Sequence, residues 1–343
     1  MRQLTALDQQ FLALEDSRHV GHVGELAVLD PSTAPGGTVT VEDLQLLIAD
    51  RLPLVPPFRW RLATVPFDLD YGYWLDDADF DLDFGRISAH RRFAFGCLSL
   101  DEVKDVKNSY GCTVNDVIVS ICAGAVRRWL LEHRELPDDP LVAQIPVSVR
   151  TELQQGTYGN RILLMTAPLY TNEADPIRRL RATREALSQM KERYRALPAE
   201  LLQDANQFIP PAMFSRAARL TFVIGSSGRG RPAWNLVVSN VPGPQFPLYM
   251  AGARVEANYP ISVITDGMGL NITVMSYCGR LDFGIVADRE QVPDLWALIG
   301  WLGEALEELK PAGRARSRSA QANGGDRKKS SVTEREPGSR QGG

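Results

Sequence analysis

The sequence contains no run of about 18 apolar residues, and its first ten residues, MRQLTALDQQ, include no hydrophobic stretch of the kind that a secretory signal has. A helix needs about 20 mainly apolar residues to cross a bilayer, so neither a transmembrane helix nor a secretory signal is supported. We therefore expect a cytoplasmic protein.

Cysteine and histidine are also scarce. The four cysteines are Cys97, Cys112, Cys122 and Cys278. None belongs to a C-x-x-C pair or has a histidine nearby, which argues against a zinc site or a redox pair, and we interpret them as buried free thiols. The four histidines are His19, His22, His90 and His133. No two of them are adjacent, and a histidine with a chemical role would have to be one of these four.

Charge is divided unevenly along the chain. From Pro311 onward there are eight Lys or Arg residues against three Asp or Glu, a net charge of +5; the whole chain carries −4, so residues 1–310 carry −9. The basic segment has no aromatic residue and one valine, too little apolar surface to offset the entropy lost on ordering. We expect residues 311–343 to be a disordered tail. The acidic body argues against nucleic-acid binding.

The body has the alternation of short β-rich segments and helical segments that is typical of an α/β protein. Four segments are interpreted as strands: LVAQIPVSVR, RILLMTAPLY, NLVVSN and GARVEANYPISV. Two more, GLNITVMSY and LDFGIVADRE, are separated only by Cys278, Gly279 and Arg280, which predicts a hairpin with glycine at the turn.

Four helical segments are expected, and one of them is a region around PAMFSRAARLTFVIG. The first begins with Thr113 as N-cap and Asp116 in the first turn, and its apolar residues recur on one face. The second, DPIRRLRATREALSQMKERYRAL, begins at Asp175. The closing helix places five apolar residues on one face, Leu295, Trp296, Ile299, Leu302 and Leu306. We interpret that face as core, with contact to a lipid surface as the alternative.

Several long segments, in the same order along the chain, resemble one family. They are LTALDQQFLALEDSRHVGHVGELAVLD, RLPLVPPFRWRL, TVNDVIVSICAGAVRRWL, VAQIPVSVR, NLVVSNVPGP and GLNITVMSYCGRLDFGIVADREQVPD. They resemble the bacterial wax ester synthase/acyl-CoA:diacylglycerol acyltransferase family, over nearly everything from Leu4 to about Leu309. The resemblance implies a chloramphenicol-acetyltransferase-like α/β fold, the CoA-dependent acyltransferase architecture, with acyl transfer at the interface of two domains.

The resemblance also implies a reaction: a long-chain acyl group moves from acyl-CoA to diacylglycerol, giving triacylglycerol, or to a long-chain alcohol, giving a wax ester. Acyl-CoA is then a co-substrate, and no permanently bound cofactor is expected. Such a transfer needs a base for the hydroxyl proton and donors for the oxyanion. In the family the base belongs to a His-His-x-x-x-Asp-Gly motif, which this chain lacks.

The discrepancy lies in the segment DDADFDLDFGRISAHRRF. Up to Phe84 the sequence follows the family's early N-terminal domain, and from Gly85 it resumes near the C-terminal domain. We infer that a central segment is missing, and a true deletion, an error in the gene model and a pseudogene all fit this loss. The expected organisation is a truncated N-terminal remnant over residues 1–84, a largely complete C-terminal acyltransferase domain over 85–310, and the tail over 311–343. The strand in HVGELAVLD is expected to pair with the remaining sheet.

No catalytic residue is therefore predicted. His22 is the one candidate for a substitute base, because strand-like sequence and small residues surround it; a histidine at a strand edge is the alternative. The candidates for supporting the substrate cleft are Asn115, Asp116, Asn240, Pro242 and Gly243. The Asn240 amide can orient a substrate, and equally can end a strand before Pro-Gly-Pro; helix capping alone would explain Asn115 and Asp116.

Two functions remain open at this point. One is the family's O-acyl transfer, impaired or lost in this chain, with acyl-CoA and diacylglycerol or a long-chain alcohol as partners. The other is a non-catalytic remnant that keeps lipid binding or protein contacts. Both leave room for peripheral contact with the inner face of the plasma membrane or with lipid inclusions.

Overall fold

The computed structural model describes residues 1–5, 8, 9, 11, 12, 15, 21–66, 70–77, 91–148, 162–195, 234–265 and 268–311. Its largest element is a six-stranded mixed sheet, the main sheet, with the strand order β5-β12-β11-β8-β6-β7. These strands are β5 (Arg91–Ser99), β6 (Leu141–Ser148), β7 (Ile162–Leu169), β8 (Leu236–Pro242), β11 (Leu270–Tyr277) and β12 (Arg280–Asp288). In the centre β11, β8 and β6 pair in parallel, and the other pairs are antiparallel. The strands predicted from β-rich sequence are confirmed.

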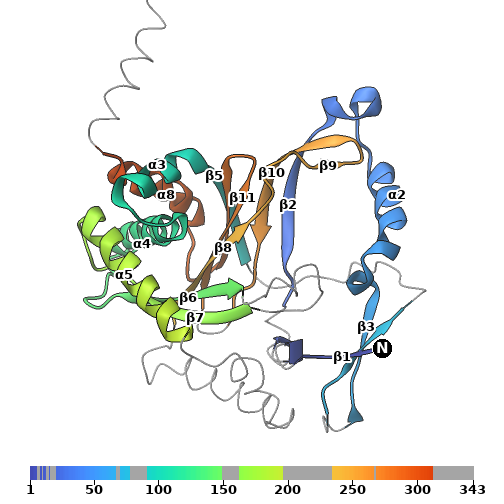
Figure 1. Ribbon diagram of the computed structural model, residues 1–343, viewed down its shortest axis with the longest axis horizontal. Coiled ribbons are helices and arrows are strands. Elements are labelled where there is room, and N and C mark those ends of the chain that lie inside the picture. The colour runs from blue at the N-terminus through green and yellow to red at the C-terminus, as the bar shows by residue number, and fades with distance from the viewer. Residues whose placement is uncertain are drawn as a thin grey trace, which may run out of the picture.

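Four helices gather on one side of the main sheet (Figure 1). They are α3 (Leu100–Tyr110), α4 (Val114–Glu132), α5 (Pro176–Arg195) and α8 (Leu295–Leu309). The layer is centred on α4, against which α3, α5 and α8 all pack. Apolar residues of these helices and of the main sheet form one continuous core.

Helix α4 is buried around most of its circumference, not along one face as predicted. Eleven of its residues are buried, among them Val119, Cys122 and Ala123, which the one-face interpretation leaves outside. Its start follows the prediction: Thr113 Oγ1 accepts the N–H of Asp116 at 3.2 Å, and an Asp116 carboxylate oxygen accepts the N–H of Thr113 at 2.8 Å. This capping box satisfies two backbone donors that the first turn leaves free.

The predicted hairpin is confirmed. Strands β11 and β12 pair along their whole length and end on the pair Tyr277 and Arg280. The two residues between them, Cys278 and Gly279, have φ of 43° and 80°. Positive φ at both central positions gives a turn whose twist matches that of the strands, and glycine adopts this conformation without steric cost.

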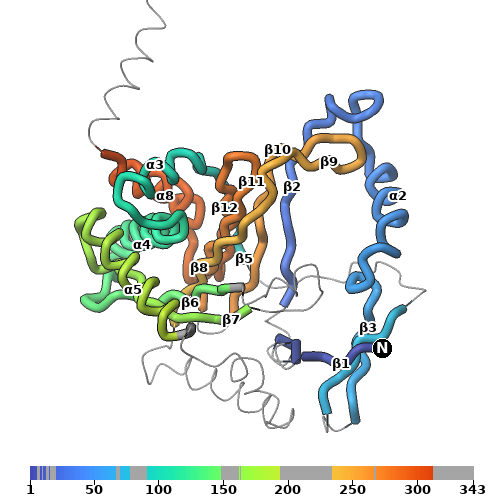
Figure 2. Tube along the Cα trace, viewed as in Figure 1, coloured from blue at the N-terminus to red at the C-terminus, as the bar shows by residue number. Residues whose placement is uncertain are grey.

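A second, three-stranded sheet joins the N-terminal part of the chain, within residues 1–77, to the C-terminal part, within residues 91–311. Its strand order is β2 (Gly24–Asp30), β10 (Ala253–Ile261) and β9 (Tyr249–Met250). The segment HVGELAVLD forms β2 and pairs with β10, a strand of the C-terminal part, and not with the main sheet. Figure 2 shows β2 and β10 side by side. Strand β10 crosses close over β12, where a Cβ on Gly284 would lie 1.7 Å from the Pro260 carbonyl oxygen.

Strand β8 continues beyond Asn240, where the sequence predicts its end. Val241 and Pro242 still align with Met275 and Ser276 of β11. Proline is tolerated there because it lies at the exposed end of the strand and need not donate a ladder hydrogen bond.

The two long C-terminal helices follow the prediction in part. Helix α5 begins as predicted, since Asp175 Oδ1 accepts the N–H groups of Ile177 and Arg178 at 2.9 and 2.8 Å. In α8, Leu295, Leu302 and Leu306 are buried, but Trp296 is 57% exposed and the prediction that it faces the core is wrong. Its ring meets the edge strand β5, with the Phe95 ring centroid 5.3 Å away.

The N-terminal part packs much less densely than the C-terminal part. It adds a small sheet of β1 (Arg2–Gln3), β4 (Tyr73–Asp76) and β3 (Trp60–Ala63), helix α2 (Val41–Arg51), and short 3-10 helices at Pro31–Thr33, Pro35–Gly37, Leu52–Leu54 and Pro56–Arg59. Helix α2 has no buried residue, and Leu46 is 71% exposed. The helix lies on the far side of β2 from the helix layer (Figures 1 and 2).

Within the described residues, no single helix is long and apolar enough to span a membrane. Helices α3 and α4 together have the length and the apolar composition of a span, but they are bent by 103° where they meet. The junction between residues 84 and 85, the segment PAMFSRAARLTFVIG, and residues 312–343 of the predicted tail lie outside the described residues.

Candidate functional site

The face of the main sheet opposite the helices borders a cavity of about 620 Å³. Its lining residues are Phe11, Glu15, Gly21, Val23, Gly24, Glu25, Gln144, Pro146, Ile162, Leu164, Trp234, Val237, Ser239, Val241, Pro260–Thr265, Met268, Asn271, Thr273 and Met275. They come from β6, β7, β8 and β11 of the main sheet, from the end of β10, and from the N-terminal part of the chain. The cavity thus lies where the two parts of the chain meet.

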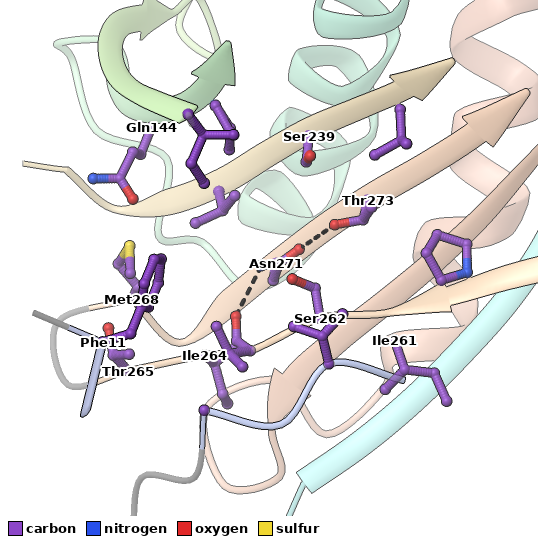
Figure 3. A pocket seen from close by; sticks show the side chains of 18 of the residues that line it. Phe11, Gln144, Ser239, Ile261, Ser262, Ile264, Thr265, Met268, Asn271 and Thr273 are labelled. Carbon is purple, nitrogen blue, oxygen red and sulfur yellow. Dashed lines mark hydrogen bonds between the residues drawn. The ribbon is translucent and has the colours of Figure 1, made fainter. Parts of the chain in front are cut away.

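Alternation along the strands decides which residues line the cavity. In β8, Val237, Ser239 and Val241 line it, and in β11, Asn271, Thr273 and Met275 do so. Because successive side chains of a strand point to opposite faces, the residues between them face the helices. The lining is mainly apolar, with a few polar groups on the floor (Figure 3). Cavities of this size and character are typical of small-molecule sites.

Two of the polar groups on the floor hydrogen-bond within the protein. Asn271 Nδ2 donates to the Val263 carbonyl oxygen at 2.8 Å, and Thr273 Oγ1 donates to Asn271 Oδ1 at 2.8 Å. This chain of bonds fixes the Asn271 side chain and ties β11 to the segment that follows β10. Both side chains are held in place before any ligand arrives.

The titratable residues among the described lining are Glu15 and Glu25. Glu15 Oε1 accepts the N–H of Gly21 at 2.9 Å. Burial raises the pKa of the Glu25 carboxyl group above its ordinary value. The cause is desolvation, which disfavours the charged form of an acid. The described residues contain no group of three His, Cys, Asp or Glu side chains that could hold a metal ion.

Asn240, Asn115 and Asp116 come together, but on the helix side of the main sheet. Asn240 lies between two cavity-lining residues of β8, and its Nδ2 atom donates to Asn115 Oδ1 at 3.4 Å, at the first turn of α4. Asp116 is buried and forms the capping box with Thr113. The described geometry therefore shows a strand-to-helix contact for this group, away from the cavity.

Pro242 and Gly243 follow at the end of β8. The Gly243 N–H donates to Ser276 Oγ at 3.2 Å, and a Cβ at Gly243 would lie 2.3 Å from the Ser276 carbonyl oxygen. Glycine is thus needed for the close approach of this turn to β11. Neither residue is among those that line the cavity.

The described histidines do not line the cavity. His22 is exposed, although its neighbours Gly21 and Val23 are lining residues. His133 caps the C-terminus of α4, where its ring stacks on Trp129 with centroids 4.0 Å apart and its Nε2 lies 3.7 Å from Asp294 Oδ1. His19 and His90 lie outside the described residues.

The residues that line the cavity were not predicted from the sequence. Polar residues at every second position of apolar strands, such as Ser239 in β8 and Asn271 with Thr273 in β11, were the available signal. A strand buried on both faces carries that pattern only weakly, because its apolar residues do not alternate with polar ones.

A comparison with solved structures identifies the fold. A solved wax ester synthase/diacylglycerol acyltransferase from Marinobacter aquaeolei VT8 superimposes with a TM-score of 0.67 at 23% identity, covering 90% of this chain and 98% of that one. The fold is therefore that of the CoA-dependent, chloramphenicol-acetyltransferase-like acyltransferases, as the sequence predicts.

The family follows from the sequence comparisons. The wax ester synthase/diacylglycerol acyltransferase catalytic domain matches residues 4–84 and 85–118, and the WS/DGAT C-terminal domain matches residues 158–310. The chain belongs to the wax ester synthase/diacylglycerol acyltransferase family.

Curated relatives support the same assignment. An O-acyltransferase of Acinetobacter baylyi is 36% identical over 222 residues, which are 65% of this chain and 47% of that protein. A Mycobacterium tuberculosis protein named as a probable diacylglycerol O-acyltransferase is 37% identical over 227 residues, 66% of this chain and 49% of that protein. The chain thus spans about half the length of the curated relatives it matches.

Proposed function

We propose that this chain binds the long-chain lipid substrates of an O-acyltransferase in the cavity on the main sheet, and that the transfer step itself is impaired or lost. The reaction is the movement of an acyl group from acyl-CoA, as co-substrate, to diacylglycerol or a long-chain alcohol. The observation that carries the proposal is the mainly apolar cavity of about 620 Å³ between the two parts of the chain, without a histidine in its described lining.

Binding is supported by the composition of the cavity wall. Side chains such as Val237, Val241 and Met275 present hydrocarbon, and polar groups are confined to a few positions. An alkyl chain that leaves water for such a wall gains roughly 0.8 kcal/mol for each buried CH₂ group. No permanently bound cofactor is needed for this role.

The impairment follows from the chemistry of the step. The hydroxyl oxygen of the acceptor attacks the thioester carbonyl carbon and its proton passes to a base. The carbon–sulfur bond then breaks, and the base returns the proton to the sulfur, so that CoA leaves as a thiol. A positioned base contributes about 10²- to 10⁴-fold to such a step. The whole sequence lacks the His-His-x-x-x-Asp-Gly motif, and the match to the family's catalytic domain is interrupted between residues 84 and 85.

In this proposal the chain consists of an N-terminal remnant (1–84), a C-terminal acyltransferase domain (85–310) and a basic tail (311–343). It places a missing catalytic segment at the junction of the first two. The DNA around codons 84 and 85 tests this point, because an in-frame stretch that encodes the histidine motif between them would make the loss an error in the gene model.

A second candidate function is a non-catalytic remnant that contacts a lipid surface or a protein partner. It is favoured by the apolar side chains that the N-terminal part exposes, among them Val41, Leu46, Ile48, Leu54 and Phe58. Where exposed apolar side chains adjoin one another, they form the kind of surface that contacts a lipid or a protein partner. Peripheral association with a membrane or lipid inclusion belongs to this candidate.

Purified protein supplied with palmitoyl-CoA and either diolein or hexadecanol tests the impairment. We expect no release of free CoA thiol above the blank. Release that grows with protein concentration and disappears in His22→Ala, but persists in the matched variant His133→Ala, would show that transfer survives and that His22 serves as its base.

A further inference from the structure

Gln144 is a polar residue of the cavity lining whose amide group, like the hydroxyl group of Thr265, makes no hydrogen bond to a described residue. It lies on β6, is 7% exposed, and its side chain points into the cavity (Figure 3). Among the described residues, its amide group has no hydrogen-bond partner, whereas Asn271 and Thr273 are bonded within the protein. The amide of this buried residue offers two donors and one acceptor to a mainly apolar cavity, and is therefore free to bond a ligand.

Two neighbours of Gln144 in the lining, one along its strand and one across the ladder, are apolar. Pro146 is the next cavity-lining residue on the same strand, and Val237 of β8 is aligned with Gln144 in the parallel ladder. Neither side chain can satisfy the amide. A hydrocarbon ligand that displaces water from this place leaves the amide without any partner, which is costly in a site of low polarity.

We propose that Gln144 is a specificity-determining residue that selects lipids with an oxygen-bearing head group, a hydroxyl or a carbonyl, and places that oxygen on the floor of the cavity. This inference rests on the proposed lipid-binding function and deepens it. A hydroxyl can both donate to Oε1 and accept from Nε2 of Gln144, and an ester carbonyl can accept from Nε2. A pure hydrocarbon can do neither.

Equilibrium dialysis of the full chain with tritiated 1-dodecanol tests the proposal. The competitors are methyl dodecanoate, which has a carbonyl but no hydroxyl, and dodecane, which has neither. We expect the wild type to bind dodecanol about tenfold more tightly than dodecane. In Gln144→Met, a substitution of similar size without hydrogen-bonding groups, the preference should fall to about one, while dodecane binding stays equal or improves.

Two controls make the outcome decisive. Gln189→Met makes the same change on the exposed face of α5, outside the cavity, and should leave the preference unchanged. The thermal midpoint of Gln144→Met without ligand should equal or exceed that of the wild type, because the substitution breaks no hydrogen bond to a described residue; a structural role for Gln144 would lower it instead.

The results separate the two proposals. If the wild type binds none of the three ligands, both the lipid-binding function and the role of Gln144 are overturned. If it binds them but Gln144→Met keeps the tenfold preference, or loses thermal stability, the role of Gln144 is overturned and lipid binding stands. A preference for dodecanol over methyl dodecanoate identifies the hydroxyl as the recognised group, and the reverse order identifies the carbonyl.

Discussion

Asn240 shows what a single position along a strand decides. Its neighbours Ser239 and Val241 line the cavity, and Asn240 itself reaches Asn115 across the opposite face of the main sheet. The sequence predicted a strand here and a constrained asparagine. Which of two faces a residue serves depends on what packs against each face, and that is set by elements far away in the chain.

The cysteines give a prediction at the residue scale. Cys112 and Cys122 are buried as expected, whereas Cys97 and Cys278 are exposed, so the prediction of buried thiols is wrong for the latter two. Burial raises the pKa of Cys122 to about 12. At pH 8 its thiolate fraction is therefore negligible, and thiolate is the reactive form.

We expect a disulfide reagent such as 5,5′-dithiobis(2-nitrobenzoate) at pH 8 to label two thiols rapidly in the native protein and four in denaturant. Cys97→Ser and Cys278→Ser should each lower the rapid count to one. Rapid labelling that persists in the double variant would show that a buried thiol is accessible.

At the scale of elements, the same capping sequence supports two different helices. Thr40 with Asp43 and Thr113 with Asp116 both form a capping box, at the starts of α2 and α4. The cap fixes where each helix begins. It does not determine burial, because α2 buries no residue and α4 buries eleven. Helical stability in proteins comes mainly from tertiary packing, so the two helices are held very differently.

Two glycines give a prediction at this scale. Gly284→Ala should lower the free energy of unfolding by about 2 kcal/mol or more, because its Cβ would collide with the Pro260 backbone where β10 crosses β12. Gly300→Ala, in the interior of α8 with no atom near the added Cβ, should raise it by about 0.5 to 1 kcal/mol. Urea unfolding measured by circular dichroism checks both. Equal effects of the two substitutions would contradict the close crossing of the two sheets.

At the scale of the whole molecule, the two parts of the chain differ in how they are stabilised. The C-terminal part has a continuous core shared by the main sheet and the helix layer. The N-terminal part is joined to it chiefly through the pairing of β2 with β10, and it exposes large apolar side chains. Local stability follows buried apolar contact, so the two parts should open with different free energies.

Hydrogen exchange measured by mass spectrometry tests this difference. Peptides covering residues 41–51 of α2 should exchange at least a hundredfold faster than peptides covering 114–132 of α4, although both helices have regular backbone hydrogen bonds. Comparable protection in α2 would mean that another surface, such as a second copy of the chain, covers it in solution.

The sequence by itself determined most of the strands of the C-terminal part and the starts of two of its helices. The hairpin at Cys278 and Gly279, the caps at Thr113 and Asp175, and every strand of the main sheet except β5 follow from local steric and hydrogen-bonding preferences, which act over a few residues. The family followed as well, because long ordered segments were preserved.

The tertiary structure alone decided which faces are buried and where a cavity forms. Trp296 is exposed despite an apolar stripe, α4 is buried on nearly all sides, and the cavity draws residues from positions as far apart as Glu25, Gln144 and Thr273. Burial is a property of what a segment packs against. Those partners are brought together only when the chain has folded, so local pattern cannot specify them.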